Sequence, residues 1–179
     1  MQSNFVVELI KYTTILFFVV CCSSAQSNSP ALANAKSVSA PGNIQLPDGY
    51  AYERRRGIDS HVGAIVRSDG FTITHDIGKM AANYSAQYFP EYFEKLRKQT
   101  HLNSDAIERQ INFLQNKIEW RQRQNVNEQD LMVVLLKDST LIASFVGSDA
   151  NFIAKVDSSD KLADFFLIVL TYQPPSSKR

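Results

Sequence analysis

The chain has 179 residues and a formal net charge of +1. Its length suits one domain, and its lysines and arginines are spread along the sequence, which excludes the clustered basic surface that nucleic-acid binding requires. We interpret the one dense basic run, residues 53–56 (ERRR), as a solvated loop or strand edge rather than a contact for a phosphate or lipid headgroup.

The N-terminus has the layout of a secretory signal. An apolar run, residues 12–22 (YTTILFFVVCC), follows Lys11 and precedes the small residues Ser23, Ser24 and Ala25. A membrane span needs about 20 apolar residues, and this run is shorter. We therefore expect residues 1–25 to be a signal peptide that is cleaved after Ala25, and the protein to be periplasmic or extracellular.

Lipidation of Cys22 is the alternative. The segment VVCC resembles a bacterial lipobox only loosely, because Cys21 stands where a small residue is usual. A lipid on Cys22 would anchor the protein to a membrane, and we expect no other membrane contact. Both cysteines lie in this segment, so the mature chain is expected to have no disulfide, cysteine nucleophile or thiolate metal site.

Residues 26–45 are small and polar and contain Pro30 and Pro41, so we predict a flexible linker. A single domain, residues 46–175, should follow.

The first predicted unit of this domain is a β-hairpin over residues 61–78. Asp69 and Gly70 separate two alternating runs, which is typical of a hairpin turn. A two-residue turn would pair Ala64 with His75 on an apolar face. It would place His61 and Asp76 together on the other face.

Two helices are expected next, over residues 86–118. Aromatic residues recur at helical spacing from Tyr88, Asn103 offers an N-cap, and apolar residues follow at four-three-four spacing from Ile107. We interpret this segment as a helical hairpin with a solvated polar face.

The last third predicts more strands and a helix. A strand around Trp120 precedes two runs that flank Asp138 and Ser139, and a two-residue turn there would pair Leu136 with Leu141. Both faces of these strands are apolar, so we expect helices or another chain to cover both sides. The strand NFIAKV follows, and residues 157–160 then cap a helix that ends before Pro174.

The predicted fold is therefore α+β. It has a mainly antiparallel sheet of about six strands, a C-terminal helix packed on that sheet and an inserted helical hairpin.

The adjacent His75 and Asp76 do not predict a metal centre. Neighbours in a strand point to opposite faces, and the chain has only three histidines, so we expect no metal site and no cofactor. His61 and Asp76, if they share a face, could form an acid–base pair. We favour a surface salt bridge, because no nucleophile is identifiable beside them.

Two blocks carry a resemblance to a known group. Residues 55–84 contain GIDS-x-VG followed by a strand that ends in DIG, and residues 150–174 run from ANFIAKV through the last helix. Together they resemble the opening and closing parts of a group of uncharacterised bacterial exported proteins. The resemblance implies that the two ends fold together and that export is normal, and it carries no activity.

Three functions follow as hypotheses. The first is a non-catalytic extracytoplasmic protein that binds a partner, such as an envelope protein or a second copy of itself. The second is a hydrolase that uses His61 and Asp76. The third is a carrier of a small apolar ligand, with a pocket between the sheet and the helical hairpin lined by Tyr88, Phe89, Tyr92 and Trp120.

Overall fold

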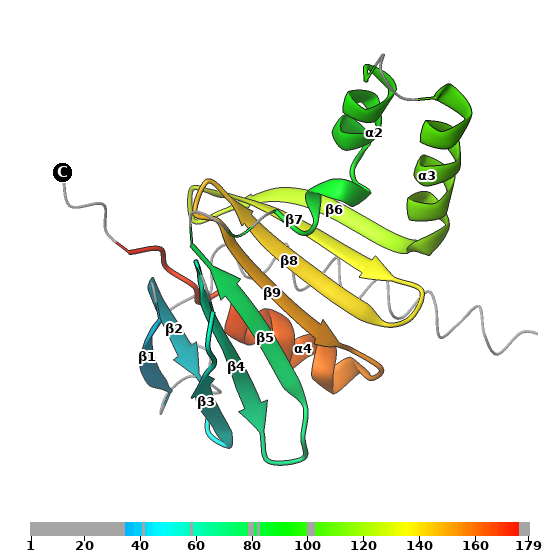
Figure 1. Cartoon of the computed structure of the whole chain (residues 1–179). Coiled ribbons are helices and arrows are strands. Elements are labelled where there is room, and N and C mark those ends of the chain that lie inside the picture. The colour runs from blue at the N-terminus through cyan, green and yellow to red at the C-terminus, as the bar shows by residue number, and fades with distance from the viewer. Residues whose placement is uncertain are drawn as a thin grey trace, which may run out of the picture.

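The computed structural model describes residues 35–40, 42–57, 59–78, 81, 83–99 and 103–175. It has the predicted α+β architecture, built on an antiparallel sheet of seven strands rather than about six (Figure 1). Its strands, in spatial order, are β3 (Tyr50–Arg54), β4 (His61–Arg67), β5 (Thr72–Ile77), β9 (Ala150–Lys155), β8 (Thr140–Val146), β7 (Gln129–Leu136) and β6 (Ile118–Val126).

A second, two-stranded sheet lies where the sequence predicts a linker. β1 (Lys36–Ala40) and β2 (Gly42–Leu46) form it, so the linker prediction is wrong from Lys36 onward. Ile44 is fully buried in the main core, and Asn43 exchanges two backbone hydrogen bonds of 2.9 Å with Gln173. Two apolar residues at alternate positions are enough to dock a short strand, but they are too few to stand out in a polar sequence. Residues 26–34 and the predicted signal peptide lie outside the described residues.

Both predicted hairpins form, but each with a register one residue away from the prediction. Ile65 pairs with Ile73, and Leu135 pairs with Leu141. The reason is the same in both cases: the turn is a three-residue loop that ends in a left-handed residue, Gly70 (φ 89°) or Ser139 (φ 64°). A loop of this kind is a type I turn followed by a bulge. One extra residue exchanges the two faces of one strand relative to its partner.

The α4 helix (Ser159–Val169) covers one face of the sheet, as predicted (Figure 1). Ser158 caps it by accepting a hydrogen bond from the backbone N–H of Lys161. Its buried residues join the inner side chains of the sheet and of β2 in the larger core cluster, which includes Phe145, Phe152, Phe165, Phe166 and Tyr172.

The predicted helical hairpin is confirmed and packs on the other face. It consists of a short 3-10 turn, η2 (Ala86–Tyr88), and the helices α2 (Pro90–Arg97) and α3 (Ser104–Lys117). Asn103 caps α3 through its side chain, as expected. A second core cluster joins the helices to Met132, Val134, Leu136 and Ile142 of β7 and β8. These two strands are therefore covered on both faces, and helices provide the cover.

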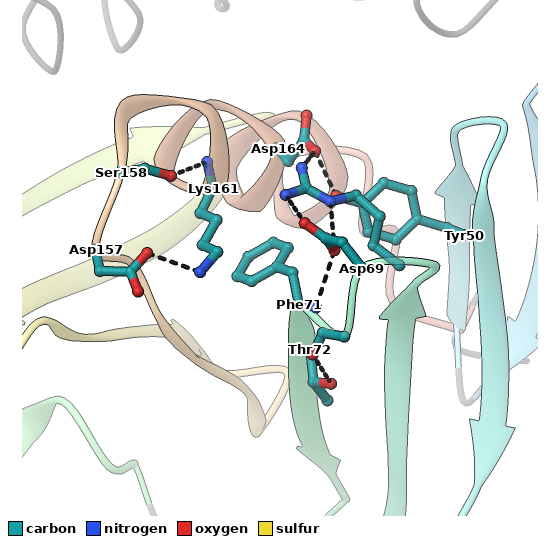
Figure 2. Close-up of polar contacts among 10 residues, drawn as sticks. Tyr50, Asp69, Phe71, Thr72, Asp157, Ser158, Lys161 and Asp164 are labelled. Carbon is teal, nitrogen blue, oxygen red and sulfur yellow. Dashed lines mark hydrogen bonds and ion pairs between the residues drawn. The ribbon is translucent and has the colours of Figure 1, made fainter.

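A polar contact holds α4 to the strands that it covers (Figure 2). Asp164 of α4 accepts a hydrogen bond from the Tyr50 hydroxyl and pairs with Arg67, each at 2.5 Å. Arg67 also pairs with Asp69 in the hairpin turn, through two hydrogen bonds of 2.9 and 2.7 Å. The hydrogen bonds from the Arg67 guanidinium, together with one from the Phe71 backbone N–H, hold the pKa of Asp69 well below its usual range. This contact joins three elements, so the β4–β5 turn and the helix are held together.

Candidate functional site

The observed register separates His61 from Asp76. His61 pairs with Ile77, whereas Asp76 pairs with Val62. Directly paired residues share a face and successive residues alternate, so His61 lies on the α4 face and Asp76 on the opposite one. The acid–base pair on one face of the hairpin, expected from a two-residue turn, is therefore not formed.

Asp76 holds the chain that leads into the helical hairpin. Its Oδ2 accepts a hydrogen bond of 2.5 Å from the Tyr84 hydroxyl. This bond, together with burial, raises the pKa of Tyr84 to about 12, so the phenol remains a donor at neutral pH. Beside Asp76 in the sheet lie Asn151 and then Ser144, which accept hydrogen bonds of 3.1 Å from the backbone N–H groups of Tyr84 and Ser85. Asp76 thus belongs to a polar row that docks residues 84 and 85.

His75 is a buried residue of the α4 face. It is 2% exposed, stacks on Tyr52 and lies 3.2 Å from the Tyr52 hydroxyl through Nε2. Burial lowers its pKa to about 4, against opposing effects of the His61 backbone and the charge of Asp76. The cross-strand partner of His75 is Gly63, where a Cβ atom would overlap the imidazole ring and lie 2.9 Å from the Tyr52 hydroxyl. Glycine is therefore required at position 63 to admit the ring.

The four aromatic residues proposed to line a carrier pocket do not lie together. Tyr88 and Phe89 are buried in the helical-hairpin core, and Tyr92 packs against that core. Trp120 pairs with Leu135 and packs against the α4-side core, on the other face of the sheet. The predicted binding set is thus divided by the sheet.

A different site emerges where β3 passes into β4. A pocket of about 590 Å³ is lined by Arg54, Arg55, Arg56, Gly57, Asp59, Ser60 and His61. The three arginines are exposed, and Ser60 is half-buried. Residues interpreted from the sequence as a solvated basic loop therefore form one wall of a concave site. The signal that could have revealed it is three consecutive arginines directly before a glycine turn, with serine and histidine after it.

Two glycines shape this pocket. At Gly57 a Cβ atom would overlap the Ser60 carbonyl oxygen and lie 3.0 Å from a Val62 methyl group. Gly78, with φ at 145°, brings its backbone against Ser60, where a Cβ atom would lie 3.4 Å from the Ser60 Cα. The backbone N–H of Arg55 closes the loop by a 2.9 Å hydrogen bond to the Val62 carbonyl. The GIDS-x-VG and DIG segments noted in the sequence thus meet in space at this loop.

The pocket has the groups of a binding site more clearly than those of a catalytic one. Asp59, Ser60 and His61 all line it, but no hydrogen bond joins these three side chains. A serine nucleophile must lie within hydrogen-bond distance of the base that activates it. Across the described ranges, no three histidine, cysteine or acidic residues are grouped to hold a metal ion. Among the helices described, none is long and apolar enough to cross a membrane.

Comparisons of this chain with protein-family models, with curated proteins and with solved structures found no match. The site is therefore interpreted from its own residues.

Proposed function

We propose that this is an exported, non-catalytic binding protein and that the pocket between β3 and β4 holds its partner. One observation carries the proposal: the chain gathers three arginines, a serine and a histidine from a strand end, a loop and a strand start around one concavity. The N-terminal signal pattern supports the export, with cleavage after Ala25 favoured over a lipid on Cys22.

The same observation favours binding over hydrolysis. Asp76 is engaged with Tyr84 on the far face of the sheet, so it is not available to His61. The carrier hypothesis has less support, because the sheet divides its aromatic residues. A pocket rich in guanidinium groups and open to solvent suits a polar partner rather than an apolar one.

The test is to produce the protein from its full-length sequence, isolate it without denaturation from the envelope fraction of the cell, and measure its intact mass by native mass spectrometry. We expect an added ligand mass that is lost in the double variant R54Q/R56Q and kept in R109Q/K95Q. The second variant removes the same formal charge from exposed positions on the helical hairpin. Equal ligand occupancy in the two variants, or ligand turnover by the wild type, would contradict the proposal.

The predicted export has its own measurement. The mass of the denatured wild-type chain should correspond to a start at Gln26. A mass that includes Cys22 with acyl groups, abolished by C22S, would identify the lipid-anchored alternative instead. A full-length chain in the cytoplasm would overturn the export proposal.

A further inference from the structure

We infer that the ligand of this pocket is a phosphate or sulfate ester of a polar molecule. The inference rests on the proposed function and adds the chemical class of the ligand. Its basis is charge: the residues that line the pocket include three arginines and one acidic residue, Asp59.

The arginines of this pocket differ from most others in the described part of the chain. Arg67, Arg97 and Arg123 each form hydrogen-bonded ion pairs with two carboxylates. Arg55 has one longer contact, 3.8 Å to Glu53. Arg54 and Arg56 have no carboxylate partner within the described residues. Two guanidinium groups at a concave site are thus left to meet an anion from outside.

Guanidinium chemistry indicates an oxyanion with several acceptor atoms. The fork of N–H donors in arginine matches phosphate and sulfate oxygens in pairs, which a halide or a single hydroxyl cannot use. Ser60 and His61 add donors on the β4 side of the same pocket. The close approach of Gly57 to Ser60 and the hydrogen bond from Arg55 to Val62 hold these residues in place, so they lose less freedom when a ligand binds.

The size of the pocket leaves room for a ligand larger than a bare ion. Its volume of about 590 Å³ falls within the range of sites for small organic molecules, which is roughly 300–1,000 Å³. Asp59 disfavours further negative charge at its side of the pocket and can accept a hydrogen bond from a hydroxyl group. A phosphate or sulfate ester of a polyol fits both features. Such a group occurs on soluble molecules and on lipid headgroups, and the two sources share this chemistry.

Binding of glycerol phosphate to the mature protein, measured by calorimetry at low salt, tests the inference. We expect saturable binding that weakens about tenfold or more in R54Q and in R56Q, because a charge-assisted hydrogen bond contributes that much. R109Q/K95Q should bind as the wild type does. Thermal unfolding midpoints equal to that of the wild type would show that the pocket variants are folded.

Vesicles distinguish the two sources. The same proteins are sedimented with phosphatidylcholine vesicles that contain or lack phosphatidic acid. Binding to the phosphatidic acid vesicles alone, lost in R54Q/R56Q, would assign the phosphate to a lipid headgroup and uphold the inference. If neither probe binds, or if R109Q/K95Q weakens binding equally, the ligand class is wrong. The proposed function would survive that result if native mass spectrometry still shows a ligand that depends on Arg54 and Arg56.

Discussion

The two halves of the seven-stranded sheet differ in how many of their faces are covered. In β7 and β8, successive residues are buried, because α4 lies on one side and the helical hairpin on the other. In β5, buried and half-exposed residues alternate strictly, whereas its neighbour β4 has three successive buried residues, two of which, Gly63 and Ala64, have little or no side chain. Figure 1 shows α4 behind β5 and β9, in the middle of the sheet, whereas α2 and α3 stand at the β6–β7 end. The alternation of a strand therefore reports the number of layers that pack on it.

Rows of directly paired residues show where the change occurs. On the helical-hairpin face, one row runs through Val134, Ile142, Ile153, Thr74 and Ala64. It begins with buried Val134 and Ile142, is half-exposed at Ile153 and Thr74, and ends at the small buried residue Ala64. On the α4 face, the adjacent row runs through Val133, Ala143, Phe152, His75, Gly63 and Arg54. It stays buried as far as Gly63 and ends at the pocket, so the singly covered half places its core directly beside the candidate site.

The largest expected effect is a loss of stability in acid, caused by the buried histidine His75 in the β5 half of the sheet. The pKa of His75 is about 4 in the folded protein and about 6.5 for a free imidazole, so the unfolded state binds more protons between these values. The contribution of neutral His75 to the free energy of unfolding is then fully present above about pH 6.5. It is lost as the pH drops toward 4, which lowers the free energy of unfolding by about 3 kcal/mol. Denaturant unfolding of wild type and H75Q across this range should show that loss in the wild type only. NMR titration of His75 near neutral pH would contradict it.

A matched pair of truncations measures how much the helical hairpin adds to stability by covering one face of the sheet. Val134 of β7 is fully buried under the helical hairpin, and Val66 of β4 is half-exposed on the same face of the sheet. We expect V134A to lower the free energy of unfolding by about 2 kcal/mol, through lost burial and a cavity. V66A should cost less than about 1 kcal/mol, since water already reaches its side chain. Equal losses in urea titrations would mean that the halves are covered alike.

The two hairpin turns should respond in opposite directions to a residue exchange. Ser139 and Gly70 occupy the same left-handed position, which costs an L-residue about 1 kcal/mol relative to glycine. S139G should therefore raise the unfolding free energy by up to about 1 kcal/mol, and G70S should lower it by about the same amount. Nothing lies within 4 Å of a Cβ atom at Gly70, so the effect is one of backbone conformation. A loss of stability in S139G would show that the turns are not equivalent.

Much of the fold could be predicted from local pattern. The helical spacing from Tyr88 and Ile107, the cap at Asn103 and the apolar stripe of the last helix each describe one element with its own period. The two-sided apolar character of β7 and β8 correctly predicted cover on both faces. The docking of β1 and β2 could not be predicted, because its basis is the burial of Ile44 and Leu46 against residues more than a hundred positions away.

The candidate site was less accessible to such reasoning. One extra residue in the β4–β5 turn places His61 and Asp76 on opposite faces of the sheet. The sequence pattern does not show whether such a turn contains a bulge. The arginine run was visible, but its meaning depended on a loop that closes against Val62 and rests on Gly78. His101, the third histidine, lies outside the described residues.

By itself, the sequence determined the α+β class and the kind of each main element from β4 to α4, because these depend on the period and chemistry of neighbouring residues. It did not reveal β1, β2 or β3. Only the tertiary structure decided which faces meet and which side chains share a site. It set the register of both hairpins, divided Trp120 from the other aromatic residues and assigned Asp76 to Tyr84. It also gathered Arg54 and His61 around one pocket. These outcomes depend on contacts between distant parts of the chain, where one residue of register reverses the result.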